Sequence, residues 1–147
     1  MSVDTKATVK ALILGIQQDY GHYTELTALL LRQHALLASH DVDGLQVHNE
    51  QQTALMAKVT QQAKLRCQQL QTLGLKPDEK GMATLIAKLP LPLRTTVANQ
   101  WQQLEQLLHQ CLRQNDLNGR LLAGQMETIH SLLGQESGYR DPDSITE

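Results

Sequence analysis

The sequence has little of what β-structure and disulfide frameworks require. Of its 147 residues, 3% are aromatic, none is phenylalanine and only two are cysteine. Strands draw on aromatic and β-branched side chains, whereas the apolar residues here are mostly leucine and alanine, and glutamine supplies much of the polar surface. Because leucine, alanine and glutamine favour helices, the composition predicts a single all-α domain.

A cluster of one charge sign and a long apolar run are also missing. The net charge is −2, and lysine and arginine are spread along the chain. Nucleic-acid binding needs a basic face that neutralises phosphates, so we expect none. No apolar run approaches the roughly 20 residues that span a bilayer, and residues 1–10 lack the apolar core of a signal peptide. We therefore expect a cytoplasmic protein without a membrane span.

The sequence carries no motif for catalysis or cofactor binding. It has no Ser-His-Asp arrangement, P-loop or GxGxxG motif. Cys67 and Cys111 are expected to lie roughly 20 Å apart along antiparallel helices, too far for a disulfide, which requires Cα atoms within about 7 Å. We expect two core thiols, no metal, no cofactor and no enzyme activity. No metal-ligand spacing links the six histidines: His22, His34, His40, His48, His109 and His130.

Apolar residues recur at helical spacing in two long stretches of the N-terminal half. The second helix is predicted to begin at Asp43, whose carboxylate accepts from the backbone N–H of Gln46. Val42 and Val47 stand at the positions of a hydrophobic staple. The short connection predicts antiparallel neighbours. The first helix is predicted over 4–39, from the spacing of Val9, Leu12, Ile13, Ile16, Tyr20, Tyr23, Leu26, Leu30 and Leu37.

The C-terminal half predicts a short helix over 82–89 and then a long helix. Gly74 is the expected stop of the second helix, Pro92 the expected first residue of the last helix, and Gly134 its stop. The fold predicted is an antiparallel bundle of three long helices plus one short helix over 1–134, followed by a disordered tail over 135–147. A coiled-coil-like seam joins Val97, Trp101, Leu104, Leu108, Cys111, Asn115, Asn118, Leu122, Gln125, Ile129 and Leu132.

Three amides interrupt this apolar seam. Asn115, Asn118 and Gln125 either pair across the bundle and fix its register, or lie in a stretch that an amphipathic helix of another protein completes. Gly119 and Gly124 each cost about 1 kcal/mol in a helix relative to alanine. They suggest the close approach of another backbone, from a neighbour in the bundle or from a bound partner.

One short motif points to a different class of helical bundle. The stretch from His130 to Gly134 is similar to the His-x-Leu-Lys-Gly motif of histidine phosphotransfer domains. Leu133 stands where that motif has lysine, so a phosphorylated His130 would lack its nearby cation. Phosphotransfer is therefore a lesser alternative. A generic helical adaptor or coiled-coil protein is the other.

The stretch 118–127, Asn-Gly-Arg-Leu-Leu-Ala-Gly-Gln-Met-Glu, resembles a motif in the last helix of the FlgN family of flagellar export chaperones. Trp101-Gln102 upstream and the order of the helices also fit that family. The resemblance implies a cytoplasmic chaperone that binds the terminal segments of the junction proteins FlgK and FlgL. Those segments form coiled coils in the filament and are disordered as monomers.

The resemblance also implies where binding occurs. The client site is expected on the last helix between Trp101 and Gln125, and the chaperone would deliver its clients to the flagellar export machinery. The free protein is expected to form a homodimer through an uncovered seam. The predicted client-binding residues are Trp101, Asn115, Asn118, Gly119, Leu121, Leu122, Gly124 and Gln125.

The tail departs from the family pattern. Family members often have a Tyr-Gly-x-x-Gly-like element after the last helix, but here Tyr139 is followed by Arg140 and Asp141. A docking role for the tail therefore depends on Tyr139 alone. The alternative is a solvated end without a role.

Overall fold

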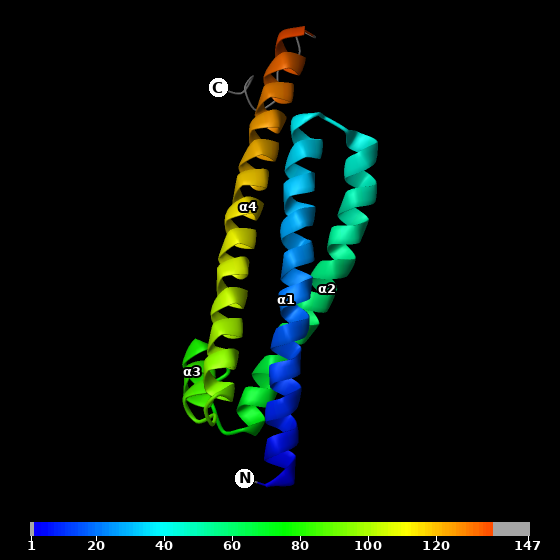
Figure 1. The fold of residues 1–147 in the computed structure, drawn as a ribbon. Coiled ribbons are helices and arrows are strands. Elements are labelled where there is room, and N and C mark those ends of the chain that lie inside the picture. The colour runs from blue at the N-terminus through cyan, green and yellow to red at the C-terminus, as the bar shows by residue number, and fades with distance from the viewer. Residues whose placement is uncertain (1, 137–147) are drawn as a thin grey trace, which may run out of the picture.

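The computed structural model describes residues 2–136, and these form four α-helices without any strand (Figure 1). The all-helical prediction of three long helices and one short helix is therefore confirmed. Residues 1 and 137–147, which include Tyr139 and most of the predicted tail, lie outside the described residues. The helices are α1 (Val3–Ala38), α2 (Val42–Thr72), α3 (Glu79–Ala87) and α4 (Leu93–Glu136).

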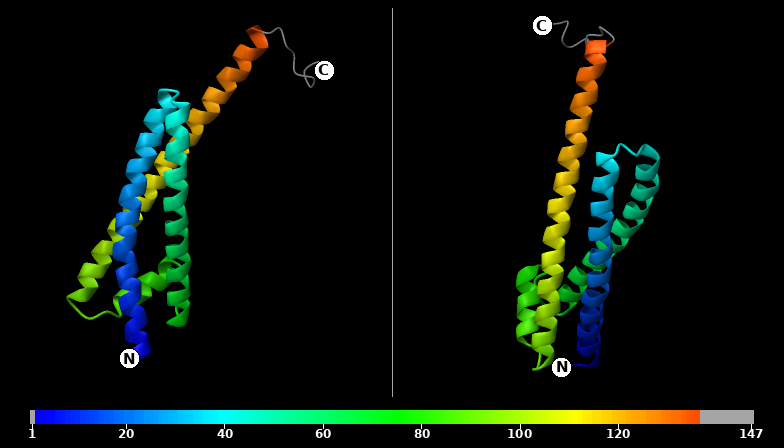
Figure 2. Two further views of the ribbon diagram at one scale, coloured as in Figure 1. Left: turned by 90° about the vertical axis from the view of Figure 1, so that its right-hand side faces the viewer. Right: turned by 45° about the horizontal axis from the view of Figure 1, so that its top comes forward.

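Helix α1 is the central element of the fold. Helices α1 and α2 form an antiparallel hairpin, and α4 runs parallel to α1 (Figure 1). Both α2 and α4 pack along α1, but they do not pack extensively on each other. With 44 residues, α4 is about 66 Å long at 1.5 Å per residue. Its C-terminal end extends beyond the turn between α1 and α2, as two further views show (Figure 2).

The turn between α1 and α2 corrects the predicted boundary. The N-cap of α2 is Asp41, which accepts a hydrogen bond from the backbone N–H of Gly44 at 2.9 Å, and the helix begins at Val42. His40 reverses the chain with a φ of 56°, so the turn is complete two residues before Asp43. The predicted cap at Asp43 and the staple are wrong, because Asp43 lies in the first turn and the side chain of Val42 is 73% exposed.

The short helix and the last helix begin close to their predicted positions. Asp78 caps α3 by accepting from the backbone N–H of Gly81 at 3.1 Å. A Cβ at Gly81 would collide with the backbone carbonyl of Lys76, so only glycine fits there. Helix α4 begins one residue after Pro92. The stop predicted at Gly134 is wrong: Gly134 lacks the positive φ that ends α2 at Gly74, so α4 continues to Glu136.

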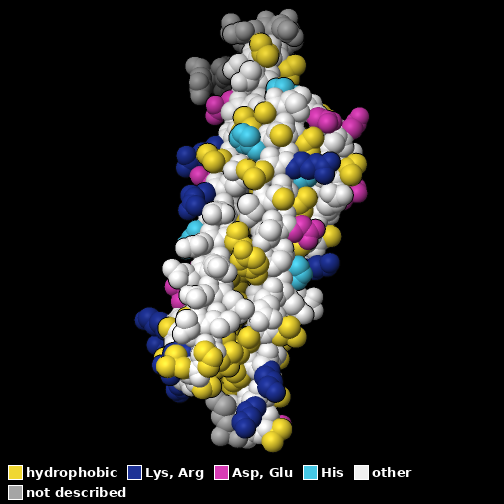
Figure 3. All heavy atoms as spheres, in the orientation of Figure 1, with side chains coloured by type: hydrophobic (Ala, Val, Ile, Leu, Met, Phe, Trp, Pro, Cys, Tyr) yellow, Lys and Arg dark blue, Asp and Glu magenta, His cyan; other side chains and the backbone are white. Residues whose placement is uncertain are grey.

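The core lies along α1, between α2 on one side and α4 on the other. On the face shown in Figure 3, apolar side chains gather along the line where α4 meets α1 and near α3, with charges of both signs around them. One residue of the apolar spacing of the first helix lies outside the core: Tyr20 is 44% exposed, whereas its neighbour Asp19 is fully buried. The best-buried apolar side chains are Leu12, Ile16, Leu70, Met82 and Val97.

A ladder of hydrogen bonds fixes the register of α4 on α1. Side chains seven residues apart on α4 each donate to a backbone carbonyl of α1, and the carbonyls are also seven residues apart. This equal spacing requires the two helices to be parallel. The bonds run from Cys111 Sγ to Tyr23 O (3.8 Å), from Asn118 Nδ2 to Leu30 O (2.8 Å) and from Gln125 Nε2 to Leu37 O (2.7 Å).

Candidate docking groove

An apolar groove lies between α2 and α4, with α1 as its floor. It exists because α2 and α4 both pack on α1 rather than on each other. Two hollows of about 210 and 170 Å³ share Tyr23 and Leu108, and we call them the lower and upper hollow of the docking groove. The upper hollow is lined by Tyr23, Leu26, Leu30, Gln52, Met56, Val59, Leu108, Cys111, Leu112 and Asn115.

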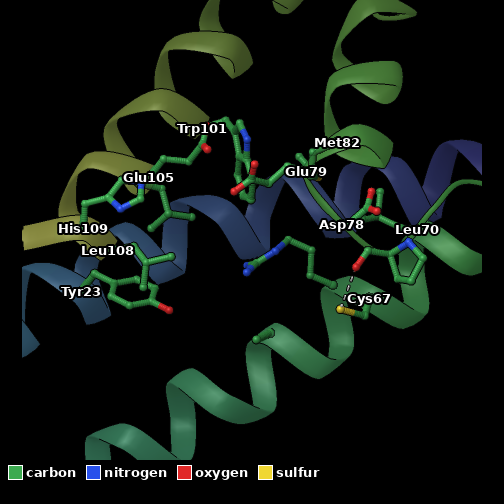
Figure 4. A pocket seen from close by; sticks show the side chains of 14 residues that line it. Tyr23, Cys67, Leu70, Asp78, Glu79, Met82, Trp101, Glu105, Leu108 and His109 are labelled. Atoms are coloured by element: carbon green, nitrogen blue, oxygen red, sulfur yellow. Dashed lines mark hydrogen bonds between the residues drawn. The ribbon is translucent and has the colours of Figure 1, made fainter. Parts of the chain in front are cut away.

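The lower hollow lies where all four helices meet. Figure 4 shows Trp101, Glu105 and His109 reaching it from α4, opposite Cys67 of α2 and the start of α3. The thiol of Cys67 donates to the backbone carbonyl of Pro77 at 3.6 Å. This bond ties the connection before α3 to α2. The lower hollow is lined by Tyr23, Ala63, Arg66, Cys67, Leu70, Pro77, Asp78, Glu79, Met82, Trp101, Leu104, Glu105, Leu108 and His109.

Arg66 joins the three long helices beneath the lower hollow. Its guanidinium donates to Asp19 Oδ2 of α1 at 2.8 Å and lies 5.3 Å from the ring centroid of Trp101 on α4. The carboxylate of Asp19 is fully buried, and His22 Nδ1 lies 3.5 Å from its second oxygen. Burial, followed by the charge of Asp19, raises the pKa of Tyr23. Arg66 is thus both an ion-pair partner and a support for Trp101.

Helix α4 also carries an exposed apolar stripe that continues the upper hollow toward its C-terminal end. Leu112 lines the hollow and is 57% exposed. Beyond it, Asn115 and Gly119 interrupt the apolar side chains, which return at Leu122 beside the last turns of α1 and recur every three or four residues from there. We call Leu112, Leu122, Met126 and Ile129 the α4 stripe; the last three are 48%, 59% and 48% exposed.

The predicted client-binding residues divide between two environments. Half-buried Trp101 and exposed Asn115 line the groove, Leu121 is half-buried, and Leu122 belongs to the α4 stripe. Asn118 and Gln125 instead bind α1, as the register-fixing alternative predicted, whereas Asn115 does not. No atom lies within 4 Å of a Cβ placed at Gly119 or Gly124, so no neighbour in this bundle needs their small size.

Several residues of the groove were not predicted from the sequence. Arg66 and Asp19 were missed because their contact joins two helices 47 residues apart in the sequence. One signal was available for Asp19, which follows Ile16 by three residues and precedes Tyr23 by four, and so occupies a core position of the α1 seam. Leu112 was missed because it lies one position beside the predicted seam of α4.

The two cysteines are free, as expected, but they differ in burial. Cys111 is buried, and burial raises the pKa of its thiol, while the Thr27 hydroxyl at 3.2 Å opposes that effect. Cys67 is half-buried at the lower hollow. Because the thiolate is the reactive form, we expect iodoacetamide at pH 8 to label Cys67 at least about tenfold faster than Cys111. Peptide mass spectrometry over time measures both rates, and equal rates would contradict this expectation.

Within residues 2–136, no group of three or more His, Cys, Asp or Glu side chains is arranged to hold a metal ion. None of the described helices combines the length and apolar character needed to cross a membrane. His130 lies on the exposed surface of α4. The predicted homodimer stays a prediction.

Comparison with known proteins identifies the family. Residues 1–136 match the family described as FlgN protein, which covers all four helices. No curated protein and no solved structure matches the chain. The match decides against the generic adaptor and the phosphotransfer domain. The chain belongs to the FlgN family, the non-enzymatic cytoplasmic chaperones that bind FlgK and FlgL for flagellar export.

Proposed function

We propose that the terminal helical segment of FlgK or FlgL binds in the docking groove and continues along the α4 stripe. The observation that carries this proposal is the open groove. Helices α2 and α4 both pack on α1 and scarcely on each other, so the two hollows form an apolar channel between them above α1. A client helix in this channel would complete a four-helix bundle, with helix axes about 8–10 Å apart.

The chemistry of the groove suits an amphipathic helix. Six of the ten residues that line the upper hollow are leucine, valine or methionine, and such surfaces take the apolar i, i+3, i+4 and i+7 side chains of a partner helix. Each Å² of apolar area removed from water contributes about 25 cal/mol, offset by the cost of ordering a disordered client. No covalent step is required, so the client can be released by a competitor or by export.

The proposal assigns separate roles to the predicted residues. Trp101 and Asn115 would contact the client from the wall of the groove, and Leu122 would contact it from the α4 stripe. Gly119 lies on the same side of α4 between Asn115 and Leu122, where the absence of a side chain lets a client backbone approach. Asn118 and Gln125, whose amides are held by α1, would keep α4 in register and act on the client only through its position.

A charge placed in the groove tests the proposal. Leu112→Glu is expected to weaken binding of a peptide from the FlgK C-terminal segment by about fiftyfold or more, because a carboxylate would be buried against apolar client side chains. The side chain is 57% exposed in the free protein, so the fold should survive. Isothermal titration calorimetry measures the affinity, and thermal melting checks the fold.

A matched control separates the groove from a general effect of charge. Leu31 lies on α1, is 56% exposed and lines neither hollow. Leu31→Glu should leave the affinity within about twofold of wild type. Unchanged binding by a folded Leu112→Glu, Leu122→Glu double variant would place the client site elsewhere on the molecule.

A further inference from the structure

We propose that the lower hollow is an anchor site for one large apolar side chain of the client that has a lysine or arginine within one helical turn. This inference rests on the proposed function, because the occupant is part of the same client helix. It adds the chemical class of residue that the client must present at this end of the groove.

The size and lining of the lower hollow suit a side chain rather than a cofactor. Its volume of about 210 Å³ is below the roughly 300–1,000 Å³ of small-molecule sites. The aromatic rings of Tyr23 and Trp101 and the side chains of Leu70 and Met82 surround it (Figure 4). The hollow is mostly apolar and open to the groove. In such hollows, one buried side chain of a partner can contribute much of the binding free energy of the complex.

The rim of the lower hollow carries uncompensated negative charge. Glu79 enters from the first turn of α3 and Glu105 from α4, and within residues 2–136 neither carboxylate has an ion-pair partner. Arg66 also lines the hollow, but its charge is matched by the buried Asp19. Asp78 adds a third carboxylate, already engaged as the cap of α3. His109 is the remaining titratable side chain of the α4 wall that faces this rim.

These two properties together define the occupant. On a helix, side chains at i and i+3 or i+4 are neighbours about 5–6 Å apart. An apolar residue inserted into the hollow would therefore bring a residue one turn away to the rim. A lysine or arginine there would meet Glu79 and Glu105, whereas an acidic residue would be repelled. Charge pairs of this kind raise the association rate and select partners.

Neutralising the rim tests the charge requirement. The Glu79→Gln, Glu105→Gln variant is expected to bind the FlgK C-terminal peptide about tenfold more weakly at low salt. The difference should shrink at about 1 M salt, where the Debye length is about 3 Å. Glu25→Gln, Glu50→Gln makes the same charge change at exposed positions of α1 and α2 that line neither hollow, and should bind like wild type.

Filling the hollow tests the apolar requirement independently. Ala63 is half-buried and lines the lower hollow, so Ala63→Leu should occupy it and weaken peptide binding by about tenfold. Thermal melting establishes whether this variant is folded. In the wild-type protein, the bound peptide should also slow the labelling of Cys67 by iodoacetamide, since Cys67 lines the same hollow.

The outcomes separate this inference from the proposed function. If Leu112→Glu abolishes binding but the rim variant binds like wild type at low salt, the client uses the groove and the anchor site is wrong. The anchor site is also wrong if replacing every lysine and arginine of the peptide with glutamine leaves its affinity unchanged. If Leu112→Glu also binds normally, the groove itself is not the client site.

Discussion

Replacing Arg66 with methionine is expected to lower the free energy of unfolding by about 3–5 kcal/mol. The substitution leaves the carboxylate of Asp19 fully buried without the guanidinium that donates to it at 2.8 Å. An unpaired buried charge is costly because water no longer solvates it. The loss of the contact with Trp101 adds a smaller cost of about 0.5–2 kcal/mol. Urea denaturation followed by circular dichroism measures the effect.

Two further variants show whether the buried charge is the cause. Asp19→Asn in the Arg66→Met background removes the charge and should recover about 2 kcal/mol of the loss. Arg66→Lys keeps a cation but loses the planar fork of donors. Its free energy of unfolding should therefore lie between those of the wild-type protein and Arg66→Met. A loss below about 1 kcal/mol in Arg66→Met would mean that Asp19 finds another partner, for which His22 at 3.5 Å is the candidate.

This ion pair also matters for the groove. Arg66 supports Trp101 from below, and Trp101 forms part of the wall of the lower hollow. The Arg66→Met variant should therefore bind the FlgK peptide more weakly even under conditions where it stays folded. We therefore expect stability and binding to fall together in this variant, because the residue that joins α1 and α2 also contacts a wall residue of α4.

The sequence predicted the helices well because their signals are local. The apolar repeat that predicts the first helix lies within one continuous segment of the sequence, and so does the repeat that predicts the last helix. The observed ends of α1 and α2 agree with the predicted ends to within one or two residues. The predicted N-cap of α2 was wrong because Asp41 and Asp43 both have a side chain suited to an N-cap. The choice between them depends on the positive φ of His40, a property of the folded turn.

The site was predicted less completely because it depends on how helices meet. Trp101 and Asn115 were predicted as client-binding residues from the motif and the seam alone, and both line the docking groove. That α2 and α4 leave a groove between them, and that Arg66 crosses beneath it, follows from their common packing on α1. The interrupted seam indicated polar contacts at Asn118 and Gln125, but the sequence did not specify that both bind the backbone of α1.

Asn118→Asp is expected to destabilise the fold by about 3 kcal/mol or more at neutral pH. The substitution preserves the shape of the side chain but removes its donors. Asn118 Nδ2 donates to Leu30 O at 2.8 Å and to Gln33 Oε1 at 3.0 Å. A carboxylate would instead place a buried negative charge against two acceptor oxygens, at a position only 3% exposed.

The pH dependence and a neighbouring control make this prediction specific. Burial raises the pKa of a carboxyl group, so in this variant the folded state would bind the proton more tightly than the unfolded state. The loss of unfolding free energy is therefore complete at pH values above the pKa that this carboxyl has in the folded variant. As the pH falls toward the ordinary aspartate pKa of about 4, the free energy of unfolding recovers relative to that of the control variant.

The control is Asn115→Asp, three residues away on the same helix but exposed to solvent. It makes the same change of charge and should stay within about 0.5 kcal/mol of wild type at neutral pH. In the wild-type protein, His34 Nδ1 also lies 3.0 Å from Asn118 Oδ1, a contact that Asn115 does not share. Equal unfolding free energies for the two variants at neutral pH would show that the amide of Asn118 does not fix the register of α4 on α1.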